Sequence, residues 1–394
     1  MKTRYTEDAH QARAAFPVPS ASGADRPTLA KIDLGALTHN YQEVMRRAGK
    51  RKILAVVKAQ AYGHGALRVS QRLLGLGADM LGVAFVEEGR ELREAGIQAP
   101  ILVMGAIFPE QAEEIVRLGL TPIVYNDTLA KALSDGARKY KKEVPVHVKV
   151  DTGMGRLGLG PGAVIDFIRG IRKFDGIRIE GLMTHFADAD LRDKQFASKQ
   201  MDRFETLMKA LAEQGMNISL CHAANSAAVL DFDRAFFTMV RPGLMLYGYN
   251  PLEAAPDGPH IDVRPVLSLV TRIAFLKRTP AGVPISYGRT FVTKRESLIA
   301  TIPVGYADGY ARSLSNRGEA LVRGTRVPVA GRVCMDMTML DVTDVPGARE
   351  GDDVVLIGAQ AGERITAEDI AAKTGTIPYE VLCGISGRVP RVYV

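Results

Sequence analysis

Between Pro27 and about residue 260, short runs of β-branched and apolar residues alternate with amphipathic stretches at nearly regular intervals. Such alternation is typical of βα units, in which each strand joins one parallel sheet and each helix covers it. Eight runs at this spacing fit a (β/α)8 barrel of the TIM type better than an open doubly wound sheet. The runs follow a helical pattern at 34–48 and span residues 53–57, 80–84, 101–104, 121–125, 144–150, 177–184, 217–221 and 236–240.

The rhythm changes beyond about residue 265, where β-rich segments separated by turns predominate. These segments are residues 266–276, 298–304, 320–343, 353–357 and 389–394, with one helical pattern at 367–373. We therefore predict an α/β chain with a (β/α)8 barrel over residues 28–262 and a mostly β domain over residues 263–394, joined near the proline-rich stretch 251–265. Residues 1–27 lack the apolar core of an export signal, which predicts a poorly ordered leader on a cytoplasmic protein.

The composition is that of an ordinary globular protein. Of the 394 residues, 46% are hydrophobic and 24% are charged. No apolar run approaches the roughly 20 residues of a membrane-spanning helix, so no membrane partner is expected. The net charge of +7 is scattered, and its densest cluster, residues 138–142, ends a helical pattern without any RNA-binding signature, so no nucleic-acid partner is expected either. Three separated cysteines without CxxC spacing predict neither disulfides nor a zinc site.

A single lysine, Lys58, follows the apolar run at residues 53–57 and opens a turn that contains Tyr62, Gly63 and Gly65. Burial at the end of a strand lowers the pKa of an ammonium group and increases the share of free amine, the form that condenses with a carbonyl. The two glycines let the backbone come close to a ligand. A lysine that merely marks where a core strand meets solvent also explains the pattern.

Polar groups that follow other predicted strands would gather at the same end of the barrel. Arg156 lies in DTGMGRLG, whose glycines have the spacing of a dinucleotide fingerprint, although a Gly-Pro-Gly segment delays the helix that such a site needs. His185 ends the sixth run, and a lone histidine there is often structural. Asn225 and Ser226 precede a short helix, where they can form an N-cap, an anion site or both.

Taken together, these segments resemble the alanine racemases, which are enzymes of fold type III that use pyridoxal 5'-phosphate (PLP). The decapeptide VVKAQAYGHG at residues 56–65 is similar to the family's cofactor-lysine motif, with Gln60 where the family more often has Asn. DTGMGRLG, LMTHFA, NSAA, RPGLMLYG and PISYGR follow in the family's order, and the resemblance runs from about Pro27 to the C-terminus. It implies interconversion of L- and D-alanine, which supplies or consumes D-alanine, a peptidoglycan precursor.

The resemblance also implies roles for individual residues. Lys58 would hold PLP, and Arg156 would lie near the cofactor's phenolate oxygen and the substrate carboxylate. Lys149 aligns with a lysine that is carbamylated in many members, and the resulting anion would hold Arg156 in place. The other cofactor contacts that the resemblance implies are Tyr62, His185, Asn225, Ser226, Arg241, Gly243, Leu244 and Tyr379, and the other substrate contacts are Tyr306 and Met335.

Arg241 has a mechanistic consequence. In the family its counterpart faces the pyridine nitrogen, where an arginine cannot supply the carboxylate that strengthens the electron sink of other PLP enzymes. Removal and return of the proton should then be closely coupled, which favours two bases on opposite faces of Cα. Lys58 would serve the D side and Tyr287 of the partner subunit the L side, with His185 and Arg241 as candidates for lowering the tyrosine pKa from its usual value near 10. A homodimer with shared active sites is implied.

These motifs leave other interpretations open. A racemase of serine or of broader amino-acid specificity would carry the same residues. A fold-type III amino-acid decarboxylase would be expected to pair the pyridine nitrogen with an acid rather than with Arg241. A catalytically silent PLP carrier would be expected to lack the second domain, and a nicotinamide dehydrogenase rests on the spacing in DTGMGRLG alone.

Overall fold

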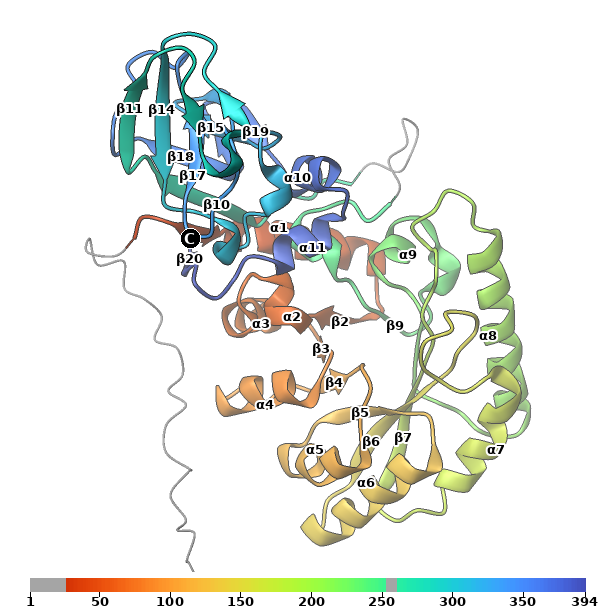
Figure 1. Cartoon of the computed structure of the whole chain (residues 1–394). Coiled ribbons are helices and arrows are strands. Elements are labelled where there is room, and N and C mark those ends of the chain that lie inside the picture. Colours follow the sequence, from red (N-terminus) through yellow and green to blue (C-terminus); the bar gives the residue numbers. More distant parts are fainter. Residues whose placement is uncertain (1–25, 253–260) are drawn as a thin grey trace, which may run out of the picture.

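The chain folds into a barrel of parallel strands and a second lobe built mostly of strands (Figure 1). The computed structural model describes residues 26–252 and 261–394. Almost all of the leader predicted at residues 1–27 and the middle of the proline-rich stretch 251–265 lie outside the described residues. In the part of the chain that is described, no helix is both long and apolar enough to cross a bilayer.

Eight parallel strands form the barrel in the spatial order β8-β7-β6-β5-β4-β3-β2-β9. The seam between β8 and β9 is nearly closed, because the backbone N–H of Arg241 donates to the carbonyl of Ala224 at 2.9 Å. The predicted (β/α)8 barrel is confirmed, and the strand ends lie within three residues of their predicted places. The strands are β2 (Lys52–Val56), β3 (Met80–Val83), β4 (Ile101–Val103), β5 (Thr121–Val124), β6 (Val144–Lys149), β7 (Ile177–Met183), β8 (Leu220–His222) and β9 (Met239–Val240).

Helices cover the outside of the barrel because each has one apolar face. In α8 the buried residues recur every three or four positions, at Ala197, Met201, Phe204, Leu207 and Leu211, which places them on one side of the helix. The helices are α1 (Leu34–Ala48), α3 (Ala66–Gly75), α4 (Val86–Glu94), α5 (Ala112–Leu118), α6 (Asp127–Tyr140), α7 (Pro161–Ile171), α8 (Gln195–Glu213) and α9 (Ser226–Asp231), with short η1 (Pro109–Gln111), η2 (Asp233–Ala235) and η3 (Leu244–Tyr247).

The second lobe contains a mixed sheet in the order β16-β15-β18-β10-β1-β20, with β19 beside β18, a three-stranded sheet β11-β14-β17 and the hairpin β12-β13. The elements are β10 (Leu267–Arg272), β11 (Phe275–Thr279), β12 (Pro284–Ile285), β13 (Phe291–Val292), β14 (Ser297–Ile302), β15 (Glu319–Val322), β16 (Thr325–Pro328), β17 (Thr338–Asp341), β18 (Asp353–Gln360), β19 (Glu363–Ile365), β20 (Arg391–Tyr393), α10 (Ala367–Thr374), α11 (Pro378–Cys383), η4 (Tyr287–Arg289), η5 (Tyr306–Asp308) and η6 (Arg312–Leu314).

Two features of this lobe differ from the prediction. The segment 266–276 is two strands, because the chain leaves one sheet for the other at Ile273 and Ala274, whose N–H groups donate to Asp352 and Thr301 respectively. The structure also contains elements that we did not predict: β12, β13, β19 and α11 in this lobe, and at the start of the described chain the strand β1 (Leu29–Ile32). This strand pairs antiparallel with β10 and parallel with β20, so the start of the described chain belongs to the sheet of the second lobe.

The chain turns in a left-handed sense directly after β2. Within α2 (Lys58–Tyr62), the residues Ala59, Gln60, Ala61 and Tyr62 all have φ between 51° and 54°. Such a conformation costs L-residues about 1–2 kcal/mol each, so surrounding contacts must offset it. One of these contacts is the carboxylate of Glu88 on α4, which accepts the N–H of Ala59 at 2.6 Å.

Gly63 ends this turn against the second lobe. It has φ +85°, and a Cβ there would lie 2.3 Å from the carbonyl oxygen of Leu382 in α11, whereas Gly77 has φ +101° with no atom within 4 Å of its Cβ position. We expect Gly63→Ala to lower the free energy of unfolding by about 1–3 kcal/mol more than Gly77→Ala, because both suffer the left-handed penalty but only Gly63→Ala creates a clash. Urea unfolding of the two variants measures the difference. Equal losses would contradict it.

Candidate active site

The candidate active site lies where the strands of the barrel end. Lys58 lies two residues after the end of β2, and its side chain is half-buried. Burial lowers the pKa of its amine, and the nearby positive charge of Arg156 lowers it further, while Glu88 acts in the opposite direction. A larger share of the amine is therefore unprotonated than on a free lysine, as the chemistry predicted for Lys58 requires.

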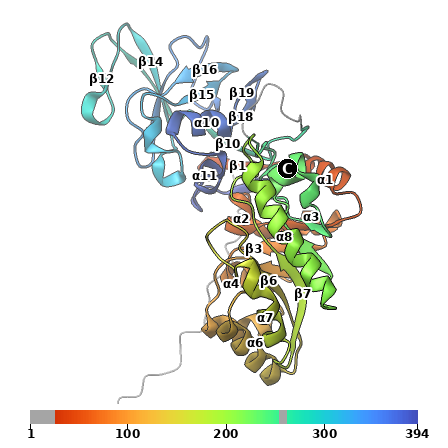
Figure 2. The same cartoon turned by 90° about the vertical axis from the view of Figure 1, so that its right-hand side faces the viewer.

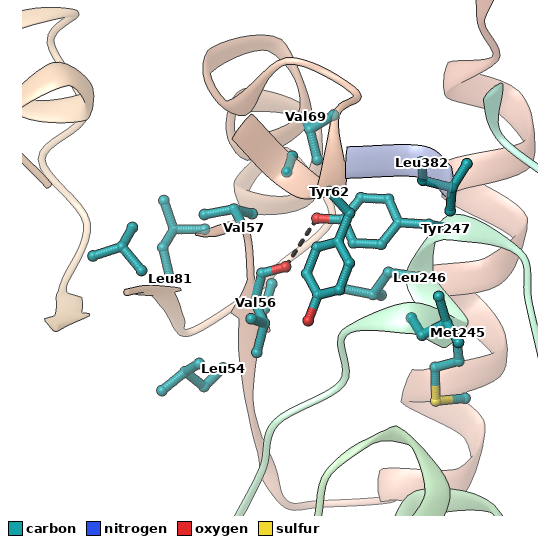
Figure 3. Close-up of a cluster of buried hydrophobic side chains, with 14 of the residues drawn as sticks. Leu54, Val56, Val57, Tyr62, Val69, Leu81, Met245, Leu246, Tyr247 and Leu382 are labelled. Carbon is teal, nitrogen blue, oxygen red and sulfur yellow. Dashed lines mark hydrogen bonds between the residues drawn. The ribbon is translucent and has the colours of Figure 1, made fainter. Parts of the chain in front are cut away.

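Two tyrosines pack beside the end of β2. The ring centroids of Tyr62 and Tyr247 are 4.8 Å apart, and the hydroxyl of Tyr247 donates to the carbonyl of Val56 at 2.8 Å (Figure 3). Tyr379 of α11 lies 5.9 Å from Tyr62, centroid to centroid. Gly243, after β9, approaches so closely that a Cβ there would be 2.6 Å from the hydroxyl of Tyr62. Three predicted cofactor contacts, Tyr62, Gly243 and Tyr379, therefore come together.

The start of α9 adjoins the same loop. The side chain of Asn225 caps this helix by accepting the N–H of Ala228 at 3.0 Å. The hydroxyl oxygen of Ser226 accepts the N–H of Gly243 at 2.8 Å, which leaves its own hydrogen available for an anion. Leu244 is buried next to Gly243. The N-cap and the anion site considered for Asn225 and Ser226 are therefore compatible.

Arg241 lies inside the barrel and is 3% exposed. Its Nη2 donates to the carbonyls of Thr184 and Ala223 at 2.8 and 2.9 Å and also lies 3.2 Å from Nδ1 of His185, while its Nη1 donates to Nδ1 of His222 at 3.0 Å. Burial lowers the pKa of Arg241 to about 9, so the guanidinium stays charged at neutral pH. Burial and this cation hold the pKa of His185 well below its usual value, so the imidazole is neutral.

A second buried cation, Lys149, ends β6 and is 4% exposed. Its Nζ donates to the carbonyl of Val150 at 2.9 Å, and burial together with the charge of Arg241 lowers its pKa to about 8. Arg156 is exposed on the loop that follows. This loop folds back so that Leu159 donates to the carbonyl of Lys149, and α7 begins only at Pro161. The glycines of DTGMGRLG therefore do not open a helix, as a dinucleotide site requires.

Three predicted site residues lie on the second lobe and face solvent. Tyr287 is 71% exposed, Met335 53% and Tyr306 40%. Tyr306 and Met335 lie on adjoining segments, because the N–H of Tyr306 donates to the carbonyl of Cys334 at 3.0 Å. The hairpin β12-β13, which precedes and follows Tyr287, lies at the end of the lobe away from the barrel (Figure 2). Within the described ranges, no hydrogen bond or ring contact links Tyr287 to Lys58.

Comparison with known proteins decides the family. Residues 32–251 match the family model "Alanine racemase, N-terminal domain", and residues 266–393 match "Alanine racemase, C-terminal domain". The chain belongs to the alanine racemase family. It is 50% identical over 369 residues to the alanine racemase of Halothermothrix orenii, covering 93% of this chain and 97% of that one.

Solved structures of alanine racemases agree with this assignment. The alanine racemase of Clostridium difficile 630 superposes with a TM-score of 0.89 at 38% identity, covering 94% of this chain and 96% of that chain. The alanine racemase of Bacillus anthracis with bound L-Ala-P superposes with a TM-score of 0.88 at 37% identity, covering 94% and 95%. The chain is therefore an isomerase, an alanine racemase, on the barrel-plus-β architecture predicted from its sequence.

Some residues near the site of this alanine racemase were not singled out in the sequence. His222 contacts Arg241, His147 contacts His222, and Glu180 contacts His147. Each is a polar residue within a short, otherwise mostly apolar barrel strand. That position was the signal that could have identified them. A polar side chain in such a strand points either into the barrel lumen or toward the helices, and in both cases it is buried and needs a hydrogen-bond partner.

Four histidines, the buried His64, His147 and His222 and the half-buried His185, should make the protein sensitive to mild acid. Burial lowers the pKa of all four, that of His64 to about 4. Below the unfolded value of about 6.5, the unfolded chain binds protons that the folded chain does not. Their contribution to stability is therefore complete above pH 6.5 and is lost as the pH falls, by up to about 1.4 kcal/mol per pH unit for each histidine.

Urea unfolding at several values between pH 6.5 and 5 measures this effect. The window lies above the range in which most carboxylates titrate, so it isolates the histidines. We expect the slope of the free energy of unfolding to correspond to between two and four protons per chain. A slope below one proton would show that these side chains are already protonated in the folded protein.

Proposed function

We propose that this alanine racemase holds PLP on Lys58 and racemises alanine with two bases, Lys58 on the D side and Tyr287 of the partner subunit on the L side. One observation carries the proposal: a half-buried amine with a lowered pKa stands at the strand ends of the barrel, beside Arg156 and within the same mouth as Arg241 and His185. A free amine of this kind is the nucleophile that a cofactor aldehyde needs.

The residues present fit this cofactor. The hydroxyl hydrogen of Ser226 is free for the phosphate, and the hydroxyl groups of Tyr62 and Tyr379 belong to the same cluster. The bonds of Arg241 within the described chain use its Nη1 and Nη2 atoms, which leaves Nε–H for the pyridine nitrogen. Gly243 and Leu244 complete the wall between Tyr62 and α9. When bound, PLP supplies the electron sink that makes the Cα–H of an attached amino acid acidic.

The side chains then divide the proton transfers. Lys58, with its lowered pKa, accepts and returns the proton on one face of Cα. Nδ1 of His185 lies 3.2 Å from Nη2 of Arg241, a guanidinium nitrogen that cannot accept a hydrogen bond, so we infer that this neutral imidazole carries its proton on Nε2. Donation of that Nε2–H to the phenolate of Tyr287 of the partner subunit would lower the tyrosine pKa toward the range in which it acts as a base. Arg156 would bind the substrate carboxylate, and Tyr306 and Met335 would line the substrate side.

The exposed residues of the second lobe support a homodimer. Tyr287, Met335 and Met337 are large side chains that are each more than half exposed, and Val292 nearby is 48% exposed. Within one chain these side chains leave the site incomplete. We propose that they enter the barrel mouth of a second copy, so that each dimer contains two shared sites.

Lys149 would be carbamylated in this arrangement. With a pKa of about 8, roughly a tenth of this buried amine is unprotonated at pH 7, a far larger share than on an ordinary lysine, and its attack on carbon dioxide gives an anion plus a released proton. That anion would replace a cation that repels Arg241 and Arg156. For the substrate, alanine is the choice that the family supports, and no contact in the structure favours serine, a broader amino-acid range or decarboxylation.

Substitution of Lys58 tests the cofactor assignment. Lys58→Ala should lose both racemisation and the visible absorbance of lysine-bound PLP, because the substitution removes the amine that would hold the cofactor. Lys52→Ala, at the exposed start of the same strand, is the control and should retain both. An absorbance scan after incubation with PLP, together with chiral chromatography of alanine, measures the outcome. Normal turnover by the Lys58→Ala protein would overturn the assignment.

Subunit complementation tests the second base. Tyr287→Phe should retain PLP and lose at least about a hundredfold in kcat, the typical contribution of one general base. A hybrid of Tyr287→Phe with Lys58→Ala has one intact shared site of two, so the isolated hybrid should have about half of the wild-type activity and a random mixture about a quarter. Co-expression with two purification tags isolates the hybrid. A hybrid as inactive as its parents would show that Lys58 and Tyr287 of one chain act together, and an active Tyr287→Phe homodimer would remove Tyr287 from the mechanism.

A further inference from the structure

A line of polar side chains crosses the interior of the barrel behind the candidate site. Starting from Arg241, Nη1 lies 3.0 Å from Nδ1 of His222, Nε2 of His222 lies 2.8 Å from Nδ1 of His147, and Nε2 of His147 lies 3.4 Å from a carboxylate oxygen of Glu180. Both histidines are 0% exposed, whereas the Glu180 side chain is 21% exposed. The line therefore runs from the site to a partly hydrated carboxylate. We call these four residues the lumen chain.

The two ends of the lumen chain fix its direction. A guanidinium can only donate hydrogen bonds, and an ionised carboxylate can only accept them. His222 must therefore accept at Nδ1 and carry its proton on Nε2, which it donates to Nδ1 of His147. His147 in turn carries its proton on Nε2 and donates it to Glu180. Hydrogen bonds that point the same way polarise one another in a dry interior.

The charges are consistent with this direction. Burial lowers the pKa of both histidines, so each is neutral and carries a single proton at pH 7. The hydrogen bond from His147 lowers the pKa of Glu180, and that from Arg178 lowers it further, so the carboxylate is ionised. Within the described chain, Arg241 has no carboxylate in direct contact. Glu180 is the anion at which its chain of hydrogen bonds ends.

The backbone is shaped around this chain. The pairing of β6 with β7 shifts at Val146 and His147, which face Ile179 and Gly181, so Glu180 is an additional residue in β7. Bulges of this kind re-aim side chains beside active sites. Gly181 then makes room for the imidazole, because a Cβ there would lie 2.5 Å from the ring of His147. The absence of a side chain at Gly181 and the extra residue in β7 therefore both favour the contact between His147 and Glu180.

We propose that Glu180 and His147 are positioning residues of this enzyme: the carboxylate sets the proton positions of both histidines and thereby holds Arg241 in the orientation that the site uses. This inference rests on the function proposed above, in which Arg241 meets the pyridine nitrogen and His185. If the direction of the chain were reversed, His222 would present an Nδ1–H to the donor Nη1 of Arg241. That arrangement is repulsive and would displace the guanidinium.

The proton positions can be measured without turnover. Selective ¹⁵N labelling of the histidines, with long-range ¹H–¹⁵N correlation spectra and assignment by single substitutions, shows which ring nitrogen of each side chain carries the proton. In the wild-type protein without PLP, we expect His147 and His222 to be neutral with the proton on Nε2. A proton on Nδ1 of either ring, or an imidazolium at pH 7, would overturn the inference whether or not the protein racemises alanine.

Glu180→Gln separates positioning from simple packing, because an amide of the same shape can donate as well as accept. We expect the His222 spectrum of this variant to show a mixture of the two proton positions. With PLP, we expect kcat to fall roughly three- to thirtyfold with KM changed less than twofold, the effect of weakening one hydrogen bond to a charged group. Unchanged proton positions together with wild-type kcat would overturn the inference.

Glu143→Gln is the matched control. Glu143 and Glu180 both accept hydrogen bonds from Arg178, at 2.8 and 3.1 Å, but only Glu180 contacts His147. Glu143→Gln should therefore leave the proton positions and kcat as in the wild type. An equal effect of the two substitutions would assign the change to Arg178 and overturn the role of Glu180. A wild-type protein that does not racemise alanine would instead refute the proposed function. The proton positions of His147 and His222 would then still test this inference.

Discussion

The left-handed turn at residues 59–62 is the constraint on which the presentation of Lys58 depends. Four successive non-glycine residues in this conformation cost about 4–8 kcal/mol, comparable with the whole net stability of many domains. Contacts from α4 and from the turn's own segment offset that cost. Glu88 accepts the N–H of Ala59, Gln60 donates to Glu91 at 2.8 Å, and Nδ1 of His64 lies 2.9 Å from the carbonyls of Ala61 and Tyr62. The position of Lys58 therefore depends on a backbone conformation that is stable only when these tertiary contacts have formed.

Residues near the C-terminus also stabilise the turn that follows Lys58. Nε of Arg391 on β20 donates to the carbonyl of Gly63 at 3.0 Å, and the hydroxyl of Tyr393 donates to the carbonyl of His64 at 3.2 Å. β20 in turn pairs with β1, whose own chain continues into α1 of the barrel. The two lobes are therefore joined by backbone pairing as well as by packing. A stable lysine loop requires the second lobe, independently of any residue that this lobe gives to a partner.

The sequence was sufficient for the barrel because its eight buried strands are apolar and regularly spaced, and family motifs indicated the residues at their ends. It was insufficient where distant partners decide the structure. β1 is four residues long and contains Lys31, so only its pairing with β10 and β20 identifies it as a strand. The turn after Lys58 contains Ala and Gln, which have no left-handed preference, so local propensity gave no signal. The contact between His147 and Glu180 depends on a bulge, and a bulge is a property of pairing rather than of one strand.

The electrostatics of the mouth explain which ligand this arrangement requires. Lys58, Lys149, Arg156 and Arg241 lie close enough to influence one another's charge or that of His185. Two nearby carboxylates, Glu88 beside Lys58 and Asp151 beside Lys149, offset only part of this positive charge. Positive charge therefore remains unbalanced at a partly dry site. The phosphorylated cofactor and the amino-acid carboxylate proposed above would bring the missing negative charge, so their binding would relieve a repulsion that folding alone leaves in place.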